Sequence, residues 1–291
     1  MHFIMLVVAL SVAWGWRCLQ VKPTHNWQQR WQQTLKLFLF PPLFLLTTAI
    51  AICWMELQSD LTQKWFDGLS FLVAIGLLGF AGILGLKLLI EAGQSKAQIN
   101  TYQQLQFNGQ VGRLLNSSIP YAAQVGLWQP ELVVSQGLLD LLPSAHLEAV
   151  LAHEQAHLVY RDTFWFLLLG WLRRLTAWLP QTEALWQDLL LLREIRADAW
   201  AAQRVNALLL IESLLLLANP PTAMLEPTSV TFSSPVVPNR LIQRVDALLT
   251  ESIFIQPLNL RSWIWLLLVL LPLTTIPLHS LSHEFYCLLS M

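Results

Sequence analysis

The sequence has few charged residues: only 12% of its 291 positions are Asp, Glu, Lys or Arg, whereas 55% are hydrophobic. A soluble domain of average composition has about 25% charged residues. This deficit excludes an ordinary soluble protein and indicates an integral membrane protein.

The sequence also lacks paired cysteines and basic runs. Its three cysteines are Cys18, Cys53 and Cys287, which show neither paired spacing nor a C-x-x-C pattern. We therefore expect no disulfide framework and no cysteine metal site. The formal net charge is −1, and no basic run is interleaved with aromatic residues. A direct nucleic-acid partner is therefore not expected.

Long hydrophobic runs are present instead. Four stretches come near the roughly 20 apolar residues that a helix needs to cross a bilayer. They are residues 2–16, 37–55, 69–90 and 263–280. The first is short, but its positive charges follow the apolar run rather than precede it, which favours a retained anchor over a signal peptide.

Positive charges are unevenly distributed over the links between these spans. The first link has Arg17, Lys22, Arg30 and Lys36 and no acidic residue, whereas the second has Lys64 as its only Lys or Arg. The positive-inside rule places the first link, and therefore the residues after the third span, in the cytoplasm. We expect a multi-pass protein of the cell (inner) membrane with a cytoplasmic domain.

The spans divide the chain into a membrane region (1–92), a domain (93–262) and a fourth span with a short tail (263–291). The polar segment 94–110 is expected to form the connection out of the membrane. Two shorter apolar runs, TFWFLLLGW and NALLLIESLLLLANP, are interrupted by charge or proline, so we expect buried or membrane-grazing helices there.

The domain is expected to be an α+β zincin-like module with a small sheet, within a mainly α membrane protein. Residues 119–128 and 132–135 have the β-branched and aromatic composition of strands. We expect the strand at 132–135 to present a free edge to an extended substrate.

The clearest chemical signal is the segment LEAVLAHEQAHLVYRDT. His153 and His157 are spaced i,i+4 on a predicted helix, so both imidazoles can close on one metal ion. Glu154 follows the first histidine and can accept a proton from a water activated by that metal, as in H-E-x-x-H zinc peptidases. The alternative is an ordinary helix with two polar faces, and a third ligand decides between them.

The third ligand is expected from a later helix. A metzincin site needs a glycine and a histidine where this chain has Tyr160 and Thr163, so that plan is excluded. In the later segment REIRADAWAAQR, Glu194 and Asp198 share one helix face. Glu194 can complete the metal ligands, and Asp198 can hydrogen-bond the far nitrogen of a ligating histidine. A solvated helix with i,i+4 charges is the alternative.

These motifs carry a family resemblance. Together with the preceding PELVVSQGLLDLL, and with three spans before them and one after, they resemble the BlaR/MecR-type antirepressor membrane zinc peptidases over about residues 30–280. The chain is more distantly similar to the HtpX and CAAX-prenyl endopeptidase group, which shares the same glutamate-zincin motifs.

The resemblance implies a role for each matching residue. His153, His157 and Glu194 match the ligands of Zn²⁺, Glu154 matches the catalytic base, and Asp198 matches the carboxylate after the third ligand.

The resemblance also implies a role for a further segment and a class of protein partner. PVVPNRLIQRVDALL resembles the family's arginine segment, so Arg240 is expected to contact either the transition-state oxyanion or a neighbouring acid. The implied partner is a protein substrate, such as a cytosolic transcriptional repressor. The signalling members carry a penicillin-binding sensor domain after the last span, and only a short tail follows it here, so no β-lactam receptor role is expected.

We therefore expect a membrane zinc endopeptidase. The alternatives are a catalytically inactive scaffold or signal transducer, and a protease for general membrane-protein quality control. A channel or carrier would need polar residues inside its spans, where Lys87 is the only charged residue. The sequence leaves open whether the chain forms a homodimer.

Overall fold

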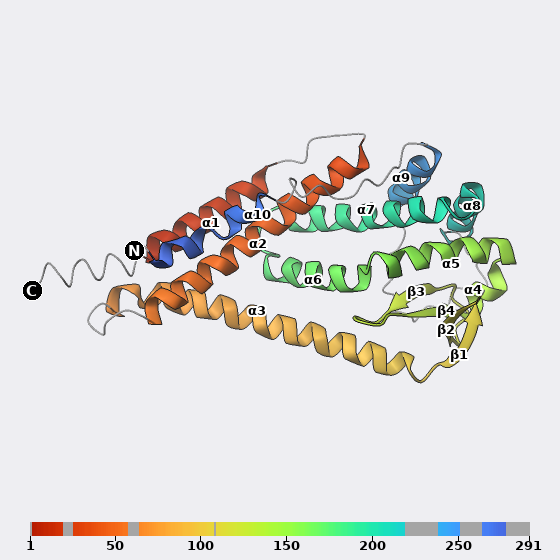
Figure 1. Ribbon diagram of the computed structural model, residues 1–291, viewed down its shortest axis with the longest axis horizontal. Helices are drawn as coiled ribbons and strands as arrows, with labels where there is room; N and C mark the ends of the chain where they lie inside the picture. Colours follow the sequence, from red (N-terminus) through yellow and green to blue (C-terminus); the bar gives the residue numbers. More distant parts are fainter. Residues whose placement is uncertain are drawn as a thin grey trace, which may run out of the picture. The chain divides into compact units, whose positions relative to one another are not determined.

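The fold is mostly helical with one small sheet, as expected from the sequence (Figure 1). The computed structural model describes residues 2–19, 26–57, 64–107, 109–218, 238–250 and 264–277. The chain divides into two compact units: one comprises Met1–Lys87, Leu169–Leu189 and Gln256–Met291, and the other comprises Leu88–Leu168 and Leu190–Ile255. Residues 169–189 thus group with the N-terminal helices, although the sequence assigned them to the domain; the predicted domain boundaries stay a prediction.

Within the part of the chain that the structure describes, two helices are long and apolar enough to cross a membrane. One is α2 (Trp27–Leu57), and the other is Gly68–Ile99 within α3 (Lys64–Ile99). They contain two of the four stretches that the sequence predicts as spans, residues 37–55 and 69–90. The helix α2 continues through Pro41 and Pro42.

The other two predicted spans stay predictions. The first coincides with α1 (His2–Cys18), a shorter apolar helix whose Ala9 and Ala13 are buried in one cluster with Leu45 of α2. The last, residues 263–280, lies partly outside the described residues, and its described part forms α10 (Leu266–Val269) and the 3-10 helix η3 (Leu271–Thr274).

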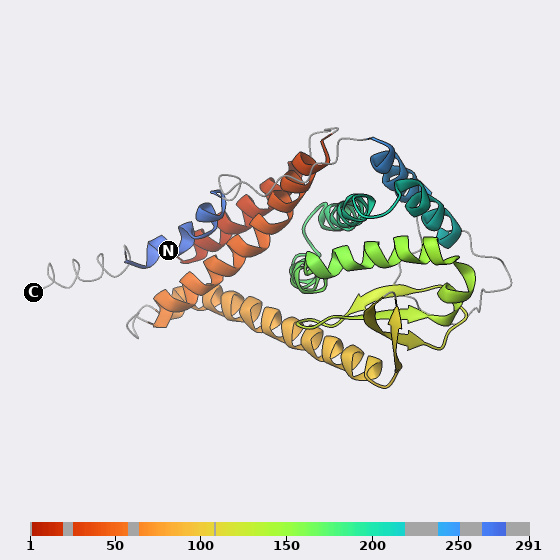
Figure 2. The same cartoon turned by 45° about the vertical axis from the view of Figure 1, so that its right-hand side comes forward.

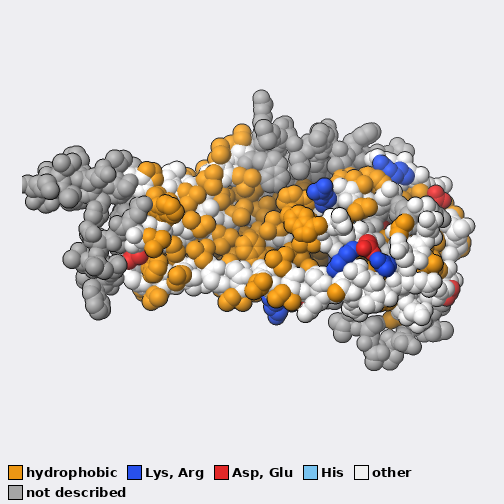
Figure 3. Space-filling view, turned by 60° about the horizontal axis from the view of Figure 1, so that its bottom comes forward, with side chains coloured by type: hydrophobic (Ala, Val, Ile, Leu, Met, Phe, Trp, Pro, Cys, Tyr) orange, Lys and Arg blue, Asp and Glu red, His pale blue; other side chains and the backbone are white. Residues whose placement is uncertain are grey.

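The face that carries α3 is covered by hydrophobic side chains (Figure 3). Leu72, Ile83 and Leu86 of α3 are each more than 60% exposed. A soluble protein rarely exposes a contiguous apolar surface of this kind without a partner.

The small sheet lies in the second unit and contains four strands in the order β1-β2-β4-β3. Their bounds are Gln103–Phe107 for β1, Gln110–Leu115 for β2, Ala122–Val125 for β3 and Glu131–Ser135 for β4. The pairing of β2 with β4 is parallel, whereas the other two pairings are antiparallel. The predicted strands at 119–128 and 132–135 correspond to β3 and β4.

The segment 94–110 contains the end of α3, which continues to Ile99, and β1, which begins at Gln103, and its role as the connection out of the membrane stays a prediction. One expectation about this sheet is wrong. The strand β4 has no free edge, because it pairs with β2 on one side and β3 on the other. The sequence could not show this, since the hairpin β1-β2 is too polar to stand out as strands.

Further described helices follow the sheet along the chain. They are α4 (Gln136–Leu141), α5 (Ser144–Val159), α6 (Asp162–Leu175), α7 (Thr182–Ala202), α8 (Ala207–Ala218) and α9 (Pro238–Leu249). The predicted apolar runs form α6 and α8.

The helix α5 lies along one face of the sheet (Figures 1 and 2). Val150 and Leu151 of α5 are buried in one cluster with Leu132 and Val134 of β4. On another side, Ala149 of α5 and Ala201 of α7 are fully buried in a shared cluster. Alanine lets two helices approach closely, and this brings the charged face of α7 to the histidines of α5.

Candidate metal centre

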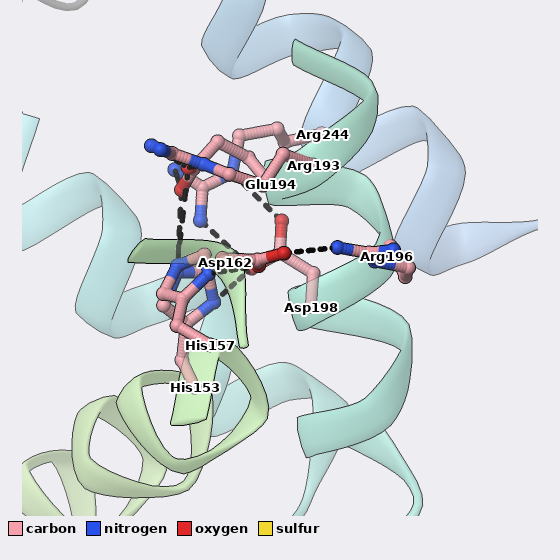
Figure 4. A network of polar contacts seen from close by, with 8 residues as sticks. All are labelled: His153, His157, Asp162, Arg193, Glu194, Arg196, Asp198 and Arg244. Carbon is pink, nitrogen blue, oxygen red and sulfur yellow. Dashed lines mark hydrogen bonds and ion pairs between the residues drawn. The ribbon is translucent and has the colours of Figure 1, made fainter. Parts of the chain in front are cut away.

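Three potential metal ligands from two helices converge at one point (Figure 4). The Nε2 atoms of His153 and His157 on α5 lie 3.2 Å apart. Glu194 on α7 places Oε2 at 3.3 Å from Nε2 of His153 and Oε1 at 3.9 Å from Nε2 of His157. The sequence predicted this combination, and the fold brings its members together.

The spacing of these atoms fits a zinc ion. In a tetrahedral site with Zn–N and Zn–O bonds of about 2.0–2.1 Å, two ligand atoms lie about 3.3 Å apart. The two Nε2 atoms, at 3.2 Å, and the pair of His153 Nε2 with Oε2 of Glu194, at 3.3 Å, match that value, whereas Oε1 of Glu194 lies 3.9 Å from Nε2 of His157. With one ligand atom from each residue, the three atoms all lie within 4.8 Å of one another. Two imidazoles and one carboxylate are also the ligand set of catalytic zinc sites that keep a fourth position open.

A carboxylate orients each histidine from its far side. Oδ1 of Asp198 lies 2.8 Å from Nδ1 of His153, and Oδ2 of Asp162 lies 2.8 Å from Nδ1 of His157. A contact at Nδ1 fixes the tautomer that leaves Nε2 available to a metal. The sequence predicted this role for Asp198 but missed Asp162, although that residue stands in the quoted motif five positions after His157.

An arginine holds each of these carboxylates in turn. Arg244 on α9 donates from Nε and Nη2 to the two oxygens of Asp198, both at 2.7 Å. Arg196 on α7 donates from Nη2 to Asp162, and its guanidinium lies 4.2 Å from the ring centre of Tyr160. Each histidine is therefore the first member of a His–Asp–Arg chain that fixes its ring.

The surroundings of Glu194 favour the ionised carboxylate, which is the form that binds a metal. Burial alone would raise the pKa of Glu194, but the charge of Arg193 and the hydrogen bond with His153 hold it well below its usual value. Arg193 donates from Nε and Nη2 to Oε1 of Glu194 at 2.9 and 2.7 Å. Nη1 of Arg244 lies 3.6 Å from Oε2 of the same residue.

The charge of Asp198 also affects His153. Burial would lower the pKa of His153, but the charge of Asp198 and hydrogen bonds with Asp198 and Glu194 outweigh it and raise the pKa to about 10. A metal ion must therefore displace a proton from this imidazole, because only the neutral ring can ligate.

Glu154 lies beside the ligands on α5 and is buried. Its burial raises the pKa of the Glu154 carboxyl group, against the opposing charges of His157 and His153. A carboxylate with a raised pKa is a stronger base and a better proton donor near neutral pH. Tyr121 directly precedes β3. Burial, and next the charge of Glu154, raise the pKa of the Tyr121 phenol.

Arg244, which contacts both Asp198 and Glu194, was not singled out by the sequence analysis. Arg240, the predicted residue, lies one turn earlier on α9. Residues at i and i+4 share a helix face, so the helical pattern alone could not separate the two. The predicted transition-state role of Arg240 stays a prediction.

In a comparison with protein families, residues 97–190 match the model of peptidase family M48. The match covers about a third of the chain and shows a similarity to these metallopeptidases. It includes His153, Glu154 and His157 and ends shortly before Glu194 and Asp198. No curated protein and no solved structure matches the chain. The BlaR/MecR-type assignment and the missing sensor domain stay predictions.

Proposed function

We propose that this protein is an integral membrane zinc endopeptidase of the H-E-x-x-H, glutamate-ligand type, which hydrolyses peptide bonds of a protein substrate on the cytoplasmic side. One observation carries the proposal: the ligand atoms of His153, His157 and Glu194 lie at zinc spacing, with Glu154 beside them. A helix with two polar faces would not require two His–Asp–Arg chains that hold both Nε2 atoms toward one carboxylate.

The chemistry divides between the metal and the side chains. Zn²⁺ supplies a Lewis acid that polarises a peptide carbonyl and lowers the pKa of a water molecule toward 7. Glu154 accepts one proton from the attacking water and then delivers it to the nitrogen of the leaving amine. One water is consumed for each peptide bond, and the burial of Glu154 favours both transfers. Asp162 and Asp198 keep the imidazoles oriented throughout.

Substrate binding is proposed at β3. Among the described strands β3 is one of the two edge strands of the sheet, and it lies against α5. Its backbone N–H and C=O groups on the side away from β4 can pair with an extended peptide. Backbone pairing demands little of the substrate sequence, which suits cleavage of a flexible protein segment.

The membrane location is supported by α2 and α3, the two helices with the length and composition of spans. We extend this to four spans with a cytoplasmic domain, on the distribution of Lys and Arg in the sequence. A transcriptional repressor as the substrate stays a prediction from the sequence resemblance, as does the alternative of general membrane-protein clearance.

The test is the cleavage of an unfolded protein, such as casein, by the chain purified in detergent with zinc. We expect cleavage that a chelator abolishes and added zinc restores. A protein that binds about one zinc per chain but cleaves neither casein nor a panel of unfolded proteins would instead be the inactive scaffold.

A further inference from the structure

Three aromatic side chains form an exposed cluster in the second unit, and we call Trp128, Phe164 and Trp165 the aromatic cluster. Trp128 is 78% exposed and Trp165 is 52% exposed. The ring of Trp128 lies 5.4 Å from that of Phe164, and Phe164 meets Trp165 edge to face at 5.1 Å. The cluster thus joins the loop after β3 to the first turn of α6, and most of its surface is open to its surroundings.

The backbone around the cluster holds these rings outward. Gly126 has φ +126°, and a Cβ there would lie 3.0 Å from the carbonyl oxygen of Gln129, so the turn before Trp128 requires glycine. Arg161 has φ 53°, and its carbonyl oxygen accepts hydrogen bonds from the N–H groups of Phe164 and Trp165. Both segments are therefore fixed turns that present aromatic side chains.

The loop that carries Trp128 is hydrogen-bonded to the end of α3, a candidate span. Nζ of Lys96 on α3 donates to the carbonyl oxygen of Gln129 at 3.1 Å and to Oε1 of Glu131 at 2.5 Å. Lys96 lies six residues after Ile90, the last residue of the apolar stretch, which is about 9 Å along a helix. The loop runs beside this part of α3 in both views (Figures 1 and 2).

We propose that the aromatic cluster inserts into the headgroup region of the membrane and that Arg161 contacts anionic lipid headgroups there. This inference rests on the proposed membrane location of α3. Interfacial side chains enter the boundary by about 5–10 Å, which matches the height of Lys96 above the apolar stretch. Tryptophan is enriched at this boundary because its ring is apolar and its N–H is polar. Arg161 is exposed in the turn beside the cluster.

The proposal bears on the substrate. Asp162, which orients His157, lies within one turn of Trp165 on α6. His157 itself lies four residues before Arg161 in the chain. A membrane-bound cluster therefore holds the candidate metal centre close to the lipid surface. The substrate class is then a peptide segment that lies next to a membrane anchor or on the bilayer surface.

The experiment measures lipid exposure at single sites of the full chain in bilayers of phosphatidylcholine and phosphatidylglycerol. In a variant with its three cysteines replaced by serine, one nitroxide is attached at Gln129, so that Trp128 is kept. Collision with oxygen, which partitions into lipid, is compared with collision with a water-soluble nickel complex. Ile83 on α3 serves as the lipid-exposed reference. Ala145, at the end of α5 opposite to Arg161, serves as the water-exposed reference.

We expect the oxygen-to-nickel ratio at Gln129 to lie between those of Ile83 and Ala145, and to fall toward Ala145 after Trp128→Ser. A ratio at Gln129 equal to that of Ala145, with Ile83 in lipid, overturns this inference and leaves the proposed function standing. Low ratios at both Gln129 and Ile83 overturn the membrane location in the proposed function, and this inference with it. Protection of Gln129 from both reagents indicates a protein partner or a second copy over the cluster, and overturns the lipid assignment.

Discussion

Oδ2 of Asp162 lies 2.8 Å from Nδ1 of His157, although the two residues belong to different helices. The helix α5 ends at Val159, and the positive φ of Arg161 turns the chain so that the first residue of α6 faces back to the end of α5. Asp198, on α7, makes the same kind of contact with Nδ1 of His153. The two histidines thus approach each other because separate carboxylates hold them, and the following predictions test what this arrangement does.

Loss of the third ligand should remove zinc. We expect about one zinc per chain in the purified protein, falling at least tenfold in Glu194→Ala, because two imidazoles alone bind the ion weakly. Metal analysis of protein prepared without chelators measures this. Glu183→Ala is the matched control, since Glu183 lies on the same helix but is largely exposed. Equal zinc in both variants would contradict the three-ligand site.

Loss of the base should separate binding from catalysis. Glu154→Gln should retain zinc and lose cleavage by roughly 10²–10⁴-fold, the usual contribution of a general acid–base group. Metal content and the rate of casein cleavage are measured on the same sample. Turnover at the native rate would remove Glu154 from the mechanism, and loss of zinc would show that it acts as a ligand.

Loss of an orienting carboxylate should weaken zinc binding without abolishing it. Asp162→Asn and Asp198→Asn should each lower the zinc affinity by about 10–100-fold, the usual effect of a group that hydrogen-bonds a metal ligand. Competition with a chromogenic chelator measures the affinity. Asp140→Asn, at an exposed position on α4, is the control and should match the native protein. A native affinity in Asp162→Asn would show that its contact with His157 does not contribute.

Acid should weaken the ion pair between Lys96 of α3 and Glu131 of β4. Hydrogen bonds from Lys96 and Arg113 lower the pKa of Glu131. A carboxyl group with a lowered pKa stabilises the fold at pH values above its ordinary pKa of 4.5, and this stability is lost as the pH falls through the lower pKa of the folded state. The contribution is less than about 1 kcal/mol, because the side chain is partly exposed.

Thermal unfolding at a series of pH values measures this contribution. Glu131→Gln should unfold at a lower temperature than the native chain at neutral pH, and the difference should shrink below about pH 4.5. A difference that stays constant across the acid range would show that the charge of Glu131 is not what stabilises the fold.

The sequence by itself determined the local chemistry. The positions of His153, Glu154 and His157 on one region of a helix follow from the 3.6-residue period, which backbone hydrogen bonds within the helix fix without outside help. The same period places Glu194 and Asp198 on one face of α7. Apolar length likewise indicated α2 and α3 as candidate spans. Each of these inferences depends only on residues close together in the chain.

Tertiary structure decided which remote groups meet. The turn at Arg161 brings Asp162 to His157, and the position of α9 places Arg244 on Asp198. Strand order puts β4 inside the sheet and β3 at its edge. No local period encodes these contacts, because they arise when buried surfaces such as those of Ala149 and Ala201 pack and fix the distance between helices. The sequence pattern therefore identified the candidate metal ligands, whereas tertiary packing decided which carboxylates and arginines hold them in place.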